Sequence, residues 1–169
     1  QKQMLGESHP TVASSYNNIG MTHRFNGAYD LAVEYCQQAL TIQKQLFGES
    51  HLDVAMSYNN IGTIHYYKEN YDLALEYYQK ALEIRKQVLN ESHPDMAISY
   101  NNIGTIYYSR GVYELALDYY QKALEIRKQV FGDTHLDVAM SYNNIGMIYR
   151  SKGNYDLALE YDHQALAIQ

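Results

Sequence analysis

The side chains of this sequence that could support catalysis are seven histidines, one cysteine and a Ser-His-Asp combination. Ser50, His51 and Asp53 are the residue types of a hydrolytic triad. Near neighbours at a helix start cannot adopt triad geometry, in which the base lies between the nucleophile and the acid. We therefore interpret them as helix-capping residues, with Ser50 as the cap. We interpret Cys36 as a buried thiol that packs rather than reacts.

A metal site is not expected, although one histidine recurs at a fixed position along the chain. The four copies are His9, His51, His93 and His135. Equivalent positions of stacked helices lie at least about 8–10 Å apart, whereas zinc needs its histidine nitrogens about 2.0–2.1 Å from one ion. The sequence also has no phosphate-binding loop or glycine-rich cofactor fingerprint. It predicts a protein without enzymatic activity, catalytic residues or cofactors.

A pair of asparagines recurs in the string Ser-Tyr-Asn-Asn-Ile-Gly, which begins at residues 15, 57, 99 and 141. An asparagine amide both donates and accepts hydrogen bonds, so it can hold the backbone of an extended peptide without reading its sequence. The first asparagine lies on a helical stripe whose members follow at spacings i, i+3, i+7 and i+10. The stripe starts at Ser14, Met56, Ile98 and Met140. The candidate peptide-binding residues are Asn17, Met21, Arg24, Asn59, Thr63, Tyr66, Asn101, Thr105, Tyr108, Asn143, Met147 and Arg150.

Two interpretations of this stripe stay open. The first asparagines either line a binding groove or cross-link neighbouring helices as a ladder of amides. The variable positions beside them either read a ligand's sequence or have drifted. A ligand-reading groove would be aromatic in the middle with an arginine at each end, so its ligand would carry an aromatic or aliphatic anchor and acidic residues. The second asparagines are expected to point to the packed side, and they are Asn18, Asn60, Asn102 and Asn144.

The constant spacing of 42 residues divides the chain into four repeats, 1–42, 43–84, 85–126 and 127–168. Each repeat reads as two helices. In the third repeat, the first helix is expected to run from a Ser92 cap to about residue 110, and the second from Tyr113 to about Phe131. Gly111 suits the left-handed end of the first helix, but Glu69 stands at that place in the second repeat, where either it or Asn70 must adopt this conformation.

A single helical hairpin cannot bury such apolar stripes, so the repeats must stack on one another. The sequence thus predicts one solenoid domain over residues 1–169. Because the chain begins and ends in the middle of the pattern, we expect it to be a fragment of a longer array.

Charge and composition exclude several classes of function. The 169 residues carry a net charge of -6, which disfavours nucleic-acid binding because that needs a basic surface. Single-stranded RNA binding through stacked tyrosines is disfavoured for the same reason. No apolar run is long enough to span a membrane. The single cysteine fits a reducing compartment, and we expect the protein to be cytoplasmic.

The repeat resembles the tetratricopeptide repeat, whose pattern is W-x2-L-G-x2-Y followed by A-x3-F. In the second repeat the matching residues are Tyr58, Ile61, Gly62, His65, Ala74 and Tyr78. The period is 42 instead of 34, and lysine replaces the closing proline, so the second helix should be about two turns longer. The 42-residue form is similar to the repeats of kinesin light chains.

This resemblance implies an all-α, right-handed solenoid whose first helices line a concave groove for extended peptides. In kinesin light chains the matching asparagine lies in the cargo groove, which supports the assignment of Asn17, Asn59, Asn101 and Asn143. We therefore expect a non-enzymatic scaffold that binds a protein or peptide. The alternative is a structural module that associates with itself by stacking end to end.

Overall fold

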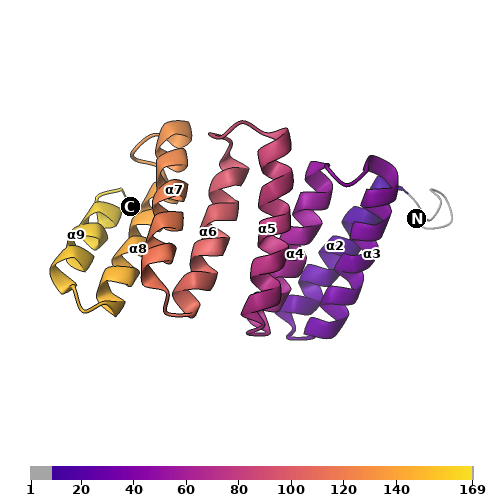
Figure 1. Ribbon diagram of the computed structural model, residues 1–169, viewed down its shortest axis with the longest axis horizontal. Coiled ribbons are helices and arrows are strands. Elements are labelled where there is room, and N and C mark those ends of the chain that lie inside the picture. Colours follow the sequence, from indigo (N-terminus) through magenta and orange to yellow (C-terminus); the bar gives the residue numbers. More distant parts are fainter. Residues whose placement is uncertain (1–8, 169) are drawn as a thin grey trace. The chain divides into compact units, whose positions relative to one another are not determined.

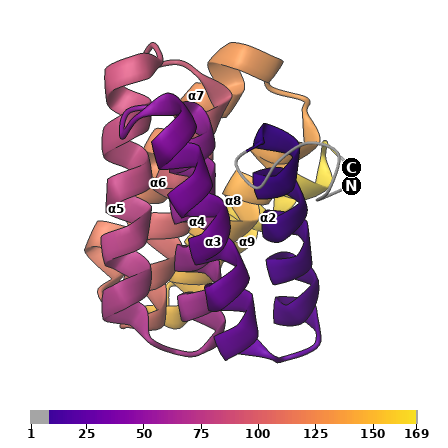
Figure 2. The ribbon, with the colours of Figure 1, turned by 90° about the vertical axis from the view of Figure 1, so that its right-hand side faces the viewer.

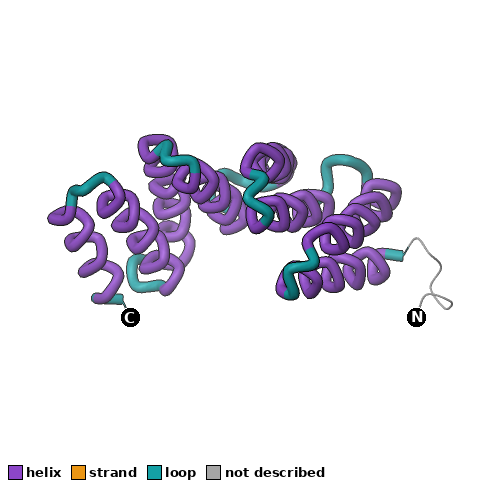
Figure 3. The backbone as a smooth tube through the Cα atoms, turned by 90° about the horizontal axis from the view of Figure 1, so that it is seen from below, coloured by secondary structure: helices purple, strands orange, loops and turns teal. Residues whose placement is uncertain are grey.

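The computed structural model of the protein describes residues 9–168, which fold into α-helices joined by short loops (Figure 1; Figure 3). The helices are α2 (Pro10–Phe25), α3 (Tyr29–Phe47), α4 (Leu52–Tyr67), α5 (Tyr71–Val88), α6 (Pro94–Ser109), α7 (Tyr113–Phe131), α8 (Leu136–Ser151) and α9 (Tyr155–Leu166). No strand occurs within residues 9–168. The all-α prediction is confirmed, as are the bounds expected for α7.

The chain consists of two compact units, residues 1–88 and residues 89–169. In the first unit, α2 and α3 lie side by side as an antiparallel hairpin (Figure 2), and α4 and α5 form a second hairpin. In the second unit, α6 pairs with α7 and α8 pairs with α9. Each hairpin corresponds to one predicted repeat. The single solenoid domain over residues 1–169 stays a prediction.

A histidine caps the first helix of each hairpin. The Nδ1 atoms of His51, His93 and His135 accept hydrogen bonds from the backbone N–H two residues further on, at 3.2, 3.1 and 3.1 Å. His9 accepts from the N–H of Thr11 at 3.2 Å. Each imidazole therefore satisfies one of the N–H groups that a helix start leaves unpaired.

The prediction that Ser50 and Ser92 are the caps was wrong. Their hydroxyls instead donate to the side-chain oxygens of Gln87 and Gln129, both at 3.1 Å. Each serine thus ties the start of its hairpin's first helix to the end of the second helix. The capping role falls to the next residue along the chain, because an imidazole with Nδ1 unprotonated is an acceptor of the same kind as a hydroxyl oxygen.

The first helices end in the left-handed conformation. Gly111 has φ 73° after α6, and Glu69 has φ 60° at the same place after α4. Of the two candidates in the second repeat, Glu69 therefore takes this conformation. A side chain there costs about 1–2 kcal/mol relative to glycine, so this turn carries strain that the other hairpins lack.

The two helices of each hairpin approach closely at a glycine. A Cβ on Gly104 would lie 2.9 Å from the ring of Tyr120, and one on Gly62 would lie 2.8 Å from the ring of Tyr78. These distances are shorter than real carbon contacts, so a larger residue would force the tyrosine aside. The glycine lets a full aromatic ring fill the space between the helices.

Successive hairpins within a unit meet through two isoleucines, and we call this contact the junction. In the first unit, Ile61 and Ile64 of α4 join one buried cluster with residues of α3. The α3 residues are Tyr29, Ala32, Val33, Cys36 and Leu40. In the second unit, Ile145 and Ile148 of α8 join the equivalent cluster on α7. The α7 residues are Tyr113, Ala116, Leu117, Tyr120 and Leu124.

Candidate functional site

The predicted binding residues lie on the first helices of the hairpins, which are α2 and α4 in the first unit and α6 and α8 in the second. We call the surface that these residues form on each unit its A-helix face. In the first unit, Asn17 is only 3% exposed. Its amide nitrogen donates to the hydroxyl of Ser57 on α4 at 2.8 Å, and that hydroxyl donates to Gln43 at 2.5 Å. The carbonyl oxygen of Asn17 is buried without a hydrogen-bond partner among the described residues. Asn17 therefore links two helices and is not accessible at the surface.

The other end of α2 carries a cation between two aromatic rings. The guanidinium of Arg24 lies 4.0 Å from the ring centre of Phe25 and 4.8 Å from that of Tyr67. Phe25 is 77% exposed, and Tyr67 is also exposed. Such cation–π contacts hold an arginine in place at a surface. Arg24 is one of the predicted residues, but the two rings lie one position beyond the stripe and were not predicted from the sequence.

The remaining predicted residues of the first unit are partly buried. Thr63 receives a hydrogen bond from the phenol of Tyr78 at 3.1 Å and donates to the backbone carbonyl of Asn59 at 2.9 Å. The ring of Tyr66 contacts that of Tyr71, with centres 5.9 Å apart. Desolvation by burial raises the pKa of Tyr78 to about 12, so its phenol is protonated and donates.

In the second unit, an amide hydrogen bond connects α6 and α8. The amide nitrogen of Asn144 donates to the carbonyl oxygen of Asn101 at 2.9 Å. Thr105 and the phenol of Tyr120 lie 3.1 Å apart, as in the equivalent pair of the first unit. The tie between Asn101 and Asn144 joins the first asparagine of one repeat to the second asparagine of the next. The stripe pattern, which compared only equivalent positions, had not predicted this offset.

In the second unit, the predicted residues on α8 are more exposed than those on α6. Asn143 is exposed and Met147 is half-buried. Arg150 donates to a carboxylate oxygen of Asp162 on α9 at 2.5 Å, so its charge is already neutralised. On α6, the hydroxyl of Tyr108 lies 3.0 Å from that of Ser151.

These contacts bear on the two interpretations of the asparagines. Asn17 and Asn101 each bond to the next first helix, as the ladder interpretation expects, although only Asn101 bonds another amide and Asn17 bonds the hydroxyl of Ser57. Asn59 is half-buried and Asn143 is exposed, so both retain surface. Among the second asparagines, Asn18 is exposed, which does not fit the expected packed position.

Three large apolar side chains recur at one exposed position of the A-helix face. Met56 is 41% exposed, Ile98 is 43% exposed and Met140 is 55% exposed. They occupy the first position of the predicted stripe in the second, third and fourth repeats. Large exposed apolar side chains that gather beside polar groups can mark a protein-binding surface.

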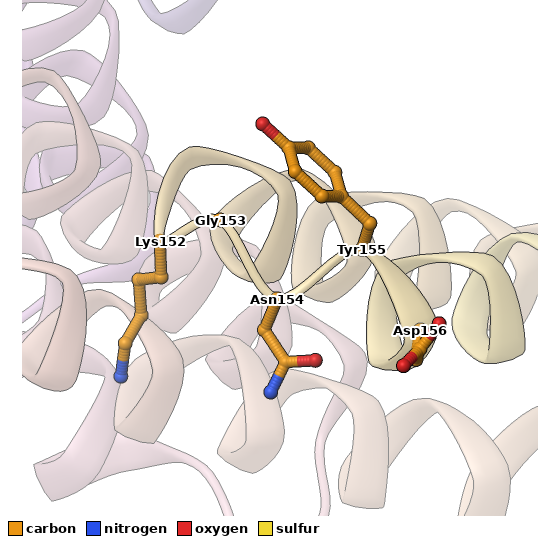
Figure 4. Close-up of a pocket in the computed structure, with 5 residues that line it drawn as sticks. All are labelled: Lys152, Gly153, Asn154, Tyr155 and Asp156. Atoms are coloured by element: carbon orange, nitrogen blue, oxygen red, sulfur yellow. The ribbon is translucent and has the colours of Figure 1, made fainter.

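A shallow depression of about 390 Å³ lies at the turn between α8 and α9, and its residues are shown in Figure 4. The side chains of Lys152 and Asn154 extend to one side of this turn, whereas Tyr155 extends to the other. Lys152 is bound to the carboxylate of Glu114. The depression therefore offers no convergent set of polar groups.

Other chemistry finds little support in residues 9–168. No cluster of three or more His, Cys, Asp or Glu side chains in this range could hold a metal ion. Cys36 is buried, and desolvation raises the pKa of its thiol to about 11, so it is a poor nucleophile. No helix within this range is long and apolar enough to cross a membrane.

A family model described as tetratricopeptide repeat matches residues 11–87, 53–129 and 95–169 in three overlapping stretches. The chain belongs to the tetratricopeptide repeat family, whose members are typically non-enzymatic scaffolds for protein interactions. No curated protein matches the chain.

Several solved structures share this fold. BtubC (BKLC) from P. vanneervenii is 26% identical with a TM-score of 0.84 over 95% of this chain, which spans 64% of the length of BtubC. A second structure comes from Podosopora anserina and is described as a kinesin light chain with nearly identical TPR-like repeats. It is 21% identical to this chain with a TM-score of 0.78. A variant of that protein has a TM-score of 0.80 at the same identity, and both alignments cover 100% of this chain and 80% of the other. The predicted resemblance to kinesin light chain repeats is confirmed.

Proposed function

We propose that this protein is a non-enzymatic scaffold that binds an extended segment of a partner protein along its A-helix faces. The observation that carries the proposal is the recurrence of Met56, Ile98 and Met140 as exposed apolar side chains at one position of successive repeats. On the A-helix face of either unit, such a side chain can anchor an apolar side chain of a ligand. Methionine suits this role because its unbranched side chain adapts to ligands of different shape.

The proposed ligand carries an aromatic or aliphatic anchor and acidic residues. Arg24 is the natural contact for a carboxylate, because its guanidinium is held between two exposed rings. Arg150 is less suited because it already binds Asp162. We propose that Asn143, which is exposed, and Asn59, which is half-buried, bond the ligand backbone. We place this activity in the cytoplasm, with which a single buried cysteine is compatible.

A peptide-display selection tests this proposal. The bait is the wild-type chain beside a variant carrying Met56→Ser, Ile98→Ser and Met140→Ser. Serine is the residue that the first repeat already has at this position, at Ser14, so the helices should persist. We expect the wild type to enrich peptides with a shared apolar and acidic pattern, and the triple variant to lose them.

The matched control carries Leu73→Ser and Leu115→Ser, which remove leucines of 42% and 44% exposure from the second helices. This control should enrich the same peptides as the wild type. If the triple variant and the wild type enrich the same peptides, the A-helix face is not the binding surface. Replacing Asn101 is a less clean test, because its amide also connects α6 to α8.

A further inference from the structure

Residues 9–168 contain five methionines, whose side chains differ widely in exposure. Met56 is 41% exposed and Met140 is 55% exposed, whereas Met96 is 2% exposed. Met21 and Met147 are half-buried. A thioether does not titrate, so the rate at which it reacts with an oxidant depends mainly on access to the side chain. Met56 and Met140 are therefore the methionines of this range that an oxidant reaches most easily.

The two exposed methionines occupy the same place in their repeats, because each is the fifth residue of a first helix. An oxygen atom added to either sulfur can extend into solvent, which leaves the packing of the hairpins unchanged. Met96 of α6 is different, because its side chain lies in the core and an added oxygen would have to fit between closely packed neighbours. Oxidation at the exposed position therefore changes a surface and not the fold.

The single cysteine does not compete with these methionines for an oxidant. Peroxides react with the thiolate form of cysteine. Cys36 is buried, and desolvation raises the pKa of its thiol to about 11, so very little thiolate is present at neutral pH. The exposed thioethers are therefore the first groups expected to react.

We propose that Met56 and Met140 are sites of reversible oxidation by hydrogen peroxide, and that this modification weakens binding at the A-helix face. The sulfur attacks one oxygen of the peroxide and supplies the two electrons that break the O–O bond. A sulfur–oxygen bond forms, and the departing hydroxide takes the proton of the transferred hydroxyl to give water. Methionine sulfoxide reductases, one for each epimer of the sulfoxide, reverse the change and release the oxygen as water at the expense of two thiols.

The weakened binding follows from the polarity of the sulfoxide, and this half of the proposal rests on the proposed function. A sulfoxide oxygen accepts hydrogen bonds from water, and an apolar ligand side chain would have to displace that water without replacing the bonds. We expect each sulfoxide to weaken ligand binding about tenfold. Ile98 cannot be oxidised, so the second unit retains one apolar side chain at this position and the first unit retains none.

Peptide mapping by mass spectrometry, after a time course in hydrogen peroxide, tests the modification without any ligand. Met56 and Met140 should gain one oxygen atom first, and Met96 should react at least about tenfold more slowly. Circular dichroism should show the same helix content before treatment and at the stage when the two exposed methionines are oxidised. Oxidation of Met96 as fast as of Met56 and Met140 would overturn the proposal, and so would a loss of helix at that stage.

The peptide-display selection described above tests the effect on binding. The baits are the untreated wild type, the wild type oxidised at Met56 and Met140, and the oxidised protein after treatment with both reductases. We expect the oxidised protein to lose the peptides that the untreated protein enriches, and the reductases to restore them.

The matched control is a variant with Met56→Leu and Met140→Leu, which has no sulfur at the two sites. It is compared only with its own untreated sample, so any effect of leucine itself on binding does not matter. Peroxide should leave the set of peptides that this variant enriches unchanged. A variant that loses its peptides on oxidation as the wild type does would show that another residue, such as Met21 or Met147, is responsible.

The results distinguish a failure of this proposal from a failure of the proposed function. If the triple serine variant loses the peptides and the oxidised wild type keeps them, the A-helix face binds the ligand and oxidation does not regulate it. If the triple serine variant keeps the peptides, the proposed binding surface is wrong and the weakened binding is refuted with it. The peptide map then still decides whether Met56 and Met140 are the sites of oxidation.

Discussion

The hairpins fall into two types that differ at three coupled positions. In α4–α5 and α6–α7, a tyrosine on the second helix bonds a threonine on the first, as Tyr78 bonds Thr63. We call these the tyrosine hairpins. In α2–α3 and α8–α9, that threonine becomes methionine and the next stripe residue becomes arginine. The tyrosine becomes Cys36 in one case and Asp162 in the other. We call these the arginine hairpins.

This difference explains much of the variation on the predicted stripe. From the sequence, the changes at the methionine or threonine position and at the arginine or tyrosine position had two explanations, ligand reading and drift. The structure adds a third, because Thr63, Thr105 and Arg150 each bond the variable residue of the second helix in the same hairpin. Arg150 bonds Asp162, whereas Tyr108 has a tyrosine, not a carboxylate, at the equivalent place. The residue types along the stripe therefore depend on packing within each hairpin as well as on any ligand.

The largest effect should come from placing an arginine-hairpin residue in a tyrosine hairpin. Tyr120→Asp removes a ring that is 1% exposed and leaves a carboxylate in its place without a cation. We expect the free energy of unfolding to fall by about 3–5 kcal/mol, measured by urea denaturation. Adding Thr105→Met and Tyr108→Arg recreates the set found in α8–α9 and should recover part of the loss. No recovery would mean that the three positions are not coupled.

The glycine between the helices should be less tolerant in a tyrosine hairpin. Gly104→Ala brings a Cβ to 2.9 Å from the ring of Tyr120, which must shift. We expect a loss of about 1–3 kcal/mol. At Gly146 the nearest atom is a carboxylate oxygen of Asp162, at 2.8 Å, on a side chain that is partly exposed and can move. Gly146→Ala should therefore lower the denaturation midpoint less, and equal losses would contradict this account.

The hydrogen bond that defines a tyrosine hairpin should have a modest energy. A double-mutant cycle with Tyr78→Phe and Thr63→Val isolates the contact at 3.1 Å. We expect a coupling energy of about 0.5–1.5 kcal/mol. Met21 and Cys36 form the same positional pair in an arginine hairpin, so Met21→Leu with Cys36→Ala serves as the comparison and should show no polar coupling.

The smallest effect is expected at His65. The first unit has histidine at this position of the repeat, and the second unit has tyrosine. His65 is 8% exposed and stacks on Tyr77, with ring centres 5.5 Å apart. Desolvation by burial, and then the charge of Lys68, lower its pKa below the ordinary 6.5. The unfolded chain therefore takes up a proton first, and stability should fall as the pH drops below about 6.5.

His65→Tyr reproduces the stacked pair of Tyr107 and Tyr119 in the second unit. The variant should lose this part of the acid sensitivity, seen as a flatter dependence of melting temperature on pH between neutral and mildly acidic conditions. A wild type and variant with parallel pH profiles would show that His65 is not responsible.

The sequence was sufficient for the helices and insufficient for the side-chain contacts. Periodicity and glycine placement predicted the helices because these signals are local, and α7 has the predicted bounds. The cap was misassigned to Ser50 because a serine before an acidic residue is the commoner cap. Only the backbone conformation shows that the cap is one residue later, at His51, and that the helix begins at Leu52.

The sequence predicted which residues belong to the candidate site. It did not predict which of their side chains are exposed at the surface. Helical periodicity places Met56 and Met140 at the first position of the stripe, and both are exposed. It could not show that Asn17 is buried, since that depends on the offset between α2 and α4 that lets its amide reach Ser57. Such offsets depend on how the helices of neighbouring repeats pack. Comparing equivalent positions of the repeats in the sequence does not reveal them.

The burial of Cys36 makes the first hairpin an unusually convenient object for kinetic study. It is the single cysteine of the chain, and its thiol has no exposed surface. An alkylating reagent can reach it only when α3 separates from α2 or from α4, so the labelling rate measures how often the packing around this hairpin opens. Comparing that rate with the rate of global unfolding would show whether the first repeat frays on its own, without introducing any probe.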